Sequence, residues 1–143
     1  MANMGGDRLV IFSDGTNTWE WDGNDWTLRA PADSPSPRQY VQSATLNGGV
    51  MLFGGATANT STATFYADTW SWDGTDWTRL LAAGTPAARH ASALGSLGSS
   101  VLMFGGYGSG GTMYSDAWTW NGTTWVAAAS GPSARMGVSF AAR

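Results

Sequence analysis

Several residue types that support common kinds of chemistry are missing from this 143-residue chain. Cysteine is absent, which excludes disulfide bonds, thiol catalysis and metal sites built from thiolates. Lysine is also absent, and the seven basic side chains are arginines scattered singly along the chain. Because nucleic-acid binding needs a basic patch or stripe, the sequence predicts no nucleic-acid partner.

Charged residues and long apolar runs are scarce as well. Charged residues make up 12% of the chain, roughly half the usual share. No apolar run approaches the roughly 18 residues of a membrane-spanning helix, so we expect no membrane partner. The start of the chain, MANMGGDRLVIF, lacks the pattern of a secretory signal peptide. The sequence does not indicate in which cellular compartment the protein works. Glycine is abundant, with 20 residues, beside threonine and tryptophan, which favours an all-β protein with many tight turns.

One tryptophan-rich stretch occurs three times. The copies read TWEWDGNDWT at 18–27, TWSWDGTDWT at 69–78 and AWTWNGTTWV at 117–126. Their leading tryptophans are 51 and 48 residues apart, and all nine tryptophans of the chain lie inside the copies. Such a cluster is a sugar-stacking surface, an aromatic cage or packing between sheets. We favour packing, because the tryptophans keep a strict register and the variable loops contain none.

Two further elements repeat in the same register. A Pro-x-x-Arg element ends at Arg38, Arg89 and Arg135. An apolar element reads VMLFGG at 50–55 and VLMFGG at 101–106, and a degenerate copy reads LVIFSDG at 9–15. Three elements in one register indicate a structural repeat of about 50 residues.

Each element of the repeat is predicted to form a strand. The four-residue apolar runs suit strands that are covered on both faces, and Trp70 and Trp72 share one face of theirs. Asp-Gly or Asn-Gly pairs at 22–23, 73–74 and 121–122 predict hairpin turns, the second of which should place Trp77 beside Trp72. We therefore expect four short antiparallel strands per repeat and no helix of three turns, because glycine interrupts every window.

This repeat resembles the kelch repeat of β-propellers. The shared features are an arginine that opens the first strand, an apolar strand that ends in Gly-Gly, an aromatic third strand and a tryptophan in the fourth. The resemblance covers essentially the whole chain and implies one four-stranded blade per repeat. Two features depart from it, because Gly-His does not follow the arginines and Ser13-Asp14 stands where Gly-Gly is expected. The Asp-box hairpin of sialidase-like propellers fits less well, because Asp73 and Gly74 are adjacent.

The resemblance divides the chain into three blades. Residues 7–30 would supply strands two to four of the first blade, residues 38–82 the second blade and residues 89–129 the third. Residues 135–142 would be a first strand that completes the first blade of a partner chain. Propellers typically have four to eight blades, and two-fold assemblies are the commonest oligomers, so we expect a homodimer with six blades. A fragment of a longer propeller and a nine-bladed trimer are the alternatives.

Candidate binding residues lie in the loops that vary between repeats. Tyr66 belongs to the loop 54–68, and Tyr107 and Tyr114 belong to the loop 105–116. Varying loops on a fixed scaffold often bind ligands, and the hydroxyl-rich composition suits a glycan or a peptide. The other interpretation is that these loops are ordinary solvated connections.

The repeated arginines are the second set of candidates. Arg38, Arg89 and Arg135 would form a ring near the mouth of a central channel, where guanidinium groups bind carboxylate or phosphate. Alternatively, each arginine clamps its own repeat by binding the residue two positions before the leading tryptophan: Asn17, Asp68 or Asp116.

Catalytic groups are few. A Ser-His-Asp site would depend on the lone His90 without a nucleophile motif. Most acidic side chains sit in or beside the hairpin turns, whereas a glycosidase needs two that face one cleft. We predict no catalytic residues, no metal and no cofactor. The leading hypothesis is a non-catalytic, self-assembling scaffold or binding module, and the alternative is a carbohydrate-active propeller, either lectin or glycan hydrolase, that uses the loop tyrosines and the arginines.

Overall fold

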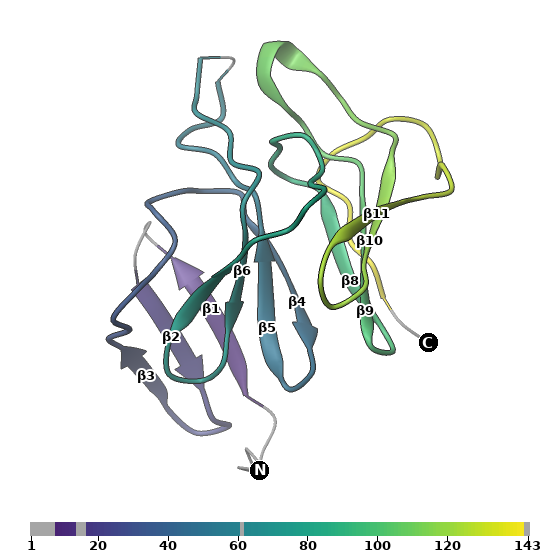
Figure 1. Ribbon diagram of the computed structural model, residues 1–143. Coiled ribbons are helices and arrows are strands. Elements are labelled where there is room, and N and C mark those ends of the chain that lie inside the picture. Colours follow the sequence, from purple (N-terminus) through teal and green to yellow (C-terminus); the bar gives the residue numbers. More distant parts are fainter. Residues whose placement is uncertain (1–7, 14–16, 61, 142–143) are drawn as a thin grey trace.

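The structure, a computed structural model, describes residues 8–13, 17–60 and 62–141 (Figure 1). Its strands, in chain order, are β1 (Leu9–Ser13), β2 (Asn17–Trp21), β3 (Trp26–Arg29), β4 (Gln42–Leu46), β5 (Gly49–Phe53), β6 (Thr69–Trp72), β7 (Trp77–Leu80), β8 (Ala93–Leu97), β9 (Ser100–Phe104), β10 (Ala117–Trp120) and β11 (Trp125–Ala128). The one helical element in these ranges is the 3-10 turn η1 (Ser109–Gly111). The prediction of an all-β chain is confirmed. Within the same ranges, no helix is long and apolar enough to cross a membrane.

The strands form three antiparallel sheets that stand in a row (Figure 1). The first sheet has the order β1-β2-β3, the second β4-β5-β6-β7 and the third β11-β10-β9-β8. Strands that follow one another in the chain are neighbours in each sheet, as short connections favour. The predicted repeat of four strands is therefore present in the second and third sheets, and the first sheet holds three strands of its repeat.

The predicted hairpin turns are confirmed. Gly74 and Gly122 have φ values of 102° and 100°, a region that glycine adopts at little cost. The side chain before the glycine also fixes the turn, because Asp73 Oδ1 accepts hydrogen bonds of 2.8 and 2.9 Å from the backbone N–H groups two and three residues later. The resulting register places Trp72 opposite Trp77, as expected.

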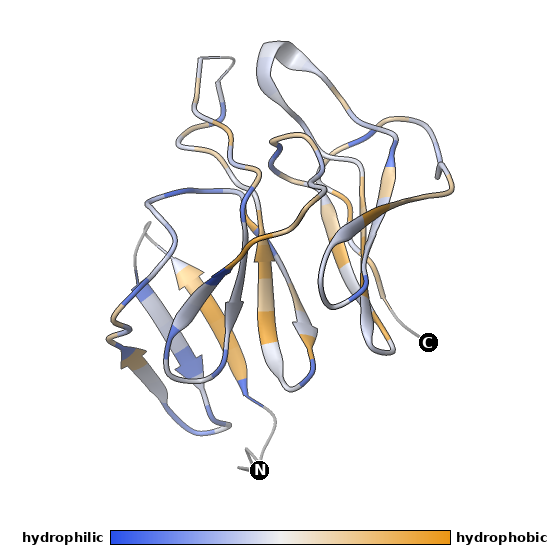
Figure 2. Cartoon of the chain, viewed as in Figure 1, coloured by the Kyte–Doolittle hydropathy of each residue, from blue (hydrophilic) through white to orange (hydrophobic). Residues whose placement is uncertain are grey.

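Two apolar clusters hold the sheets together. Between the first and second sheets, Trp70, Trp72 and Trp77 pack with Leu52 and are joined by Phe12. The cluster between the second and third sheets contains Met51, Phe53, Leu94, Val101, Met103, Trp120 and Trp125. Figure 2 shows the most hydrophobic segments along β1 and β5. The tryptophans of the second and third copies therefore pack between sheets.

The first strand of each repeat begins later than the sequence predicts. Strands β4 and β8 start at Gln42 and Ala93, four residues after the arginines that the resemblance places at their start. The cause is the backbone of Tyr40 and Ala91, whose φ values of 56° and 53° interrupt an extended chain. The Ala91 N–H donates to the Tyr40 carbonyl at 3.1 Å, so these kinks join neighbouring repeats.

Residues 135–141 form no strand within the single chain and lie beside β8 (Figure 1). The Gly137 N–H donates to the Ala91 carbonyl at 2.8 Å, and Phe140 packs against Gly95 of β8. The predicted pairing of this segment is with a second chain, and it stays a prediction. The outer bounds of the expected blades at residues 7 and 142, and the departure at Asp14, lie outside the described residues.

Candidate functional site

Arg89 is held by contacts that tie one repeat together. Its guanidinium makes a bidentate ion pair with Asp116, with Nη1–Oδ1 and Nη2–Oδ2 distances of 2.5 and 2.8 Å. Nη1 also donates to the Gly105 carbonyl at 2.9 Å, and Nε donates to the Ala87 carbonyl at 3.0 Å. Because the side chain is buried, these bonds replace the hydration that the charge has lost.

Arg38 repeats this arrangement one repeat earlier. It makes a bidentate pair with Asp68, in which the Nη2–Oδ2 distance is 3.0 Å and Nη1 donates to Oδ1. It also donates to the carbonyls of Gly54, at 3.2 Å, and Ser36, at 2.9 Å. Both arginines therefore act as clamps within their own repeats. This is one of the two roles that the sequence allows, the other being a ring that binds a ligand. Ligand binding by either arginine stays a prediction.

A tyrosine and a tryptophan complete each clamp. The guanidinium carbon of Arg89 lies 3.8 Å from the centre of the Tyr114 ring, a cation–π contact, and Trp118 Nε1 donates to Asp116 at 2.7 Å. The equivalent distances in the earlier clamp, which contains Tyr66, are 3.8 and 2.8 Å. Two of the three predicted tyrosines are therefore stacked on the predicted arginines.

The clamps keep their carboxylates ionised. Burial alone would raise the pKa of Asp68 and of Asp116, because a charged group loses hydration. Hydrogen bonds from the arginine and the tryptophan outweigh burial, and the pKa of both carboxyls lies below its usual value. Neither carboxyl is therefore a proton donor at neutral pH.

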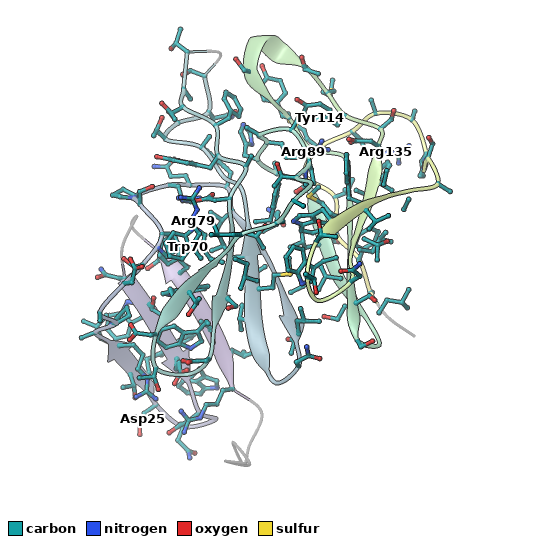
Figure 3. The ribbon with its side chains drawn as sticks, in the orientation of Figure 1. Asp25, Trp70, Arg79, Arg89, Tyr114 and Arg135 are labelled. Atoms are coloured by element: carbon teal, nitrogen blue, oxygen red, sulfur yellow. The ribbon has the colours of Figure 1, made fainter. Side chains whose placement is uncertain are left out.

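Arg135 is placed differently from the other two arginines. Its side chain is exposed and, among the described residues, it contacts no carboxylate. It donates to the carbonyl and the hydroxyl of Ser133 at 2.9 and 3.0 Å. Figure 3 shows Arg135 with Arg89 and Tyr114 at the loop end of the sheets, whereas Asp25 marks the hairpin end. Of the three predicted arginines, two are bound to carboxylates and one faces solvent.

A buried histidine adds a cluster that the sequence does not predict. His90 is 2% exposed and lies against the rings of Tyr40, Phe65 and Tyr107, with centroid distances of 5.1, 5.4 and 5.3 Å. Neither ring nitrogen has a hydrogen-bond partner within the described residues. Burial lowers the pKa of the imidazole, so the ring is neutral at neutral pH. Tyr107, the third predicted tyrosine, belongs to this cluster and not to a clamp.

Glu20, the single glutamate of the chain, joins the first and second sheets. Its carboxylate accepts hydrogen bonds from Arg8 at 2.9 Å, from Arg29 at 2.8 Å and from the Trp72 indole at 2.8 Å. Burial raises the pKa of this carboxyl, but the three donors together lower it below its usual value. Glu20 is therefore an ionised structural link and not a catalytic acid.

No three His, Cys, Asp or Glu side chains gather into a possible metal site in the part of the chain that the structure describes. Neither a protein-family model nor a curated protein matches the sequence.

Proposed function

We propose that the chain is a non-catalytic, self-assembling β-propeller scaffold of the kelch type, in which two copies form one ring of six blades. Each sheet of the structure corresponds to one blade in this proposal. The observation that carries it is the nature of the two outer faces of the row. Inside the chain, one face of each sheet packs against the opposite face of the next sheet. The outer faces of the first and third sheets hold the residues equivalent to those on the two sides of this contact. A second copy fits both faces and closes a two-fold ring.

The backbone of residues 135–137 supports this proposal. The Arg135 N–H donates to the Tyr114 carbonyl at 3.2 Å, and the Gly106 N–H donates to the Arg135 carbonyl at 2.9 Å. The equivalent bonds of Arg89, one repeat earlier, measure 3.1 and 2.9 Å. Since Arg89 leads into β8, the same placement favours the residues after Arg135 as the first strand of a further blade.

The strand that would receive this segment is β1, an edge strand of the first sheet. Unpaired backbone groups along an edge favour the addition of another strand. An apolar groove of about 210 Å³ lies beside β1, with Phe12 and Trp77 in its lining. In the second sheet, Gln42 of β4 pairs with Phe53 of β5, and in the third sheet Ala93 of β8 pairs with Phe104 of β9. Gln42 and Ala93 each lie four residues after the arginine of their repeat. The same register would place Ser139 opposite Phe12 and Phe140 opposite Ile11.

The outer face of the first sheet is apolar. Leu9, Ile11 and Trp26 are 63%, 44% and 47% exposed. The equivalent positions of the second sheet, which the first sheet covers, hold Val50, Leu52 and Trp77. Apolar patches of more than a few hundred Å² are unusual on soluble monomers, so this face favours a covering partner.

The molar mass in solution tests the proposal. A ring of two copies has twice the 15.0 kDa of the chain. It should persist at micromolar concentration, because apolar burial stabilises an interface by roughly 25 cal/mol per Å² before association costs. Size-exclusion chromatography with light scattering should find this doubled mass, and removal of residues 133–143 should abolish it. A stable 15.0 kDa species of the full chain would contradict the proposal.

One observation favours a second candidate function, a propeller that binds glycans. The exposed Arg135 has no carboxylate partner among the described residues, so it is the repeated arginine most accessible to a ligand. A glycan array tests this function with Arg135→Ala as the variant, because Arg89→Ala would also break a clamp. Binding that Arg135→Ala removes, with the circular dichroism spectrum unchanged, would support it. An array without binding would contradict it.

A further inference from the structure

A tryptophan of the second sheet occupies a socket on the first sheet. The Trp77 ring packs edge-on against Phe12, with centroids 5.7 Å apart and an interplanar angle of 76°. Its Nε1 donates to Thr18 Oγ1 at 2.8 Å. The socket is therefore built from a phenylalanine on β1 and a threonine on the neighbouring strand β2, whose hydroxyl accepts the indole N–H.

The same socket recurs between the second and third sheets. The Trp125 ring packs edge-on against Phe53 at 5.3 Å and 72°, and its Nε1 donates to Thr69 Oγ1 at 2.9 Å. Phe53 and Thr69 lie opposite each other on β5 and β6. Two junctions of the chain thus use one arrangement of three side chains.

A third copy of the socket lies on the outer face of the third sheet. Phe104 ends β9 as Phe53 ends β5, and Ala117 lies opposite Phe104 in the position that Thr69 holds. A groove of about 350 Å³ opens there, lined by both residues and by side chains of the segment 129–140. Because a cavity of roughly 150 Å³ holds a benzene ring, this groove has room for the two fused rings of an indole.

One more tryptophan stands in the matching register. Trp26 holds the position of Trp77 and Trp125 in its own repeat, but it is 47% exposed where they are 2% and 3% exposed. The Trp26 ring packs against Trp21 at a centroid distance of 5.4 Å, just as the Trp77 ring packs against Trp72 at 5.5 Å. Strands β3 and β9 lie at opposite ends of the row (Figure 1). A Trp26 that enters the groove on the third sheet therefore belongs to another copy.

We propose that the groove over Phe104 and Ala117 is the socket for Trp26 of a second copy, and that position 117 sets the strength of this junction. The inference rests on the two-copy assembly proposed above. Ala117 lacks the hydroxyl with which Thr18 and Thr69 accept an indole N–H, so Trp26 packs against Phe104 without the acceptor that those threonines supply. The socket between copies therefore lacks one hydrogen bond that each of the two sockets within a chain contains.

Substitutions at position 117 test this inference through the dissociation constant of the dimer, measured by analytical ultracentrifugation. Ala117→Thr supplies the missing acceptor, and Ala117→Val supplies the same shape without one. Leaving a buried indole N–H without its acceptor weakens each socket about five- to 150-fold, so two sockets should give a dimer at least about thirtyfold tighter for Thr than for Val. In a Trp26→Phe background, which keeps a ring but removes the N–H, the two variants should have equal constants.

The outcomes separate this inference from the assembly on which it rests. A wild-type chain that stays monomeric at every concentration overturns the two-copy assembly itself. A wild-type dimer whose Thr and Val variants dissociate equally overturns the socket and leaves the assembly standing. So does a dimer that Trp26→Ala does not weaken, because another group then fills the groove. Thermal melts of each variant confirm that the single-chain fold is retained.

Discussion

At the scale of single residues, charged groups in this chain mainly hold the repeats together. Arg38 and Arg89 are saturated by carboxylates and carbonyls, and each is stacked on a tyrosine. An arginine clamp could be anticipated from the sequence, because its arginine and its aspartate recur in step. The aromatic cluster around His90 could not, since its rings come from separate segments of the chain and are brought together only by the stacking of sheets.

His90 should make stability depend on pH in a range where the carboxylates do not titrate. The folded chain holds a neutral imidazole whose pKa lies below the usual 6.5 because of burial, and the groups packed against it are Tyr40, Phe65 and Tyr107. As pH falls below 6.5, the unfolded chain binds a proton that the folded chain does not. The free energy of unfolding should therefore fall by up to about 1.4 kcal/mol per pH unit until the folded pKa is reached.

Urea unfolding at a series of pH values, at one protein concentration, measures this effect. His90→Phe keeps an aromatic ring in the cluster and removes the titrating group, so its free energy of unfolding should stay flat between about pH 7.5 and about pH 5. Equal slopes for the wild-type chain and the variant would show that His90 is not the group responsible.

At the scale of elements, the hairpins were the easiest part to predict and the first strands the hardest. A hairpin is set by its own residues, as when Asp73 accepts two backbone N–H groups and Gly74 takes a positive φ. The delayed start of β4 and β8 depends instead on Tyr40 and Ala91, which are kinked where one repeat meets the next. Contacts between repeats leave no local signal in the sequence, so the predicted starts of these two strands were wrong by four residues.

The indole bond between the second and third sheets should carry measurable stability. Thr69→Val keeps the shape of the side chain but leaves the buried Nε1 of Trp125 without its 2.9 Å partner. An unsatisfied buried donor costs about 1–3 kcal/mol, and denaturant unfolding should show a loss of that size. In a Trp125→Phe background the same substitution should cost less, because no donor is left unpaired. An identical loss in both backgrounds would assign the effect to packing and not to the hydrogen bond.

At the scale of the whole molecule, the row of three sheets follows from three repeats in one register, and this much could be predicted. The two-copy ring expected from the sequence stays a prediction, because a repeat specifies how one sheet meets the next and not how many sheets meet. The structure adds exposed apolar side chains on the outer face of the first sheet, a groove on the outer face of the third sheet and an edge strand beside an apolar groove. These features are the physical basis for the proposed ring.

A disulfide between two chains tests the proposed ring most directly, because the chain itself contains no cysteine. The register of the second and third sheets, in which Ala44 pairs with Met51 and Gly95 with Leu102, would place Ala141 of one copy opposite Val10 of the other. Side chains directly opposite on paired strands have Cβ atoms about 4.5–5.5 Å apart, close to disulfide geometry.

Chains that carry Val10→Cys alone and Ala141→Cys alone are refolded together, oxidised and separated under non-reducing conditions. The proposed ring predicts a linked species of twice 15.0 kDa that contains one chain of each kind. It predicts no such species when Thr27→Cys, on the far edge of the first sheet, replaces Val10→Cys. Folded chains that yield no mixed disulfide from the Val10 and Ala141 pair, or as much from the Thr27 control, would contradict the ring.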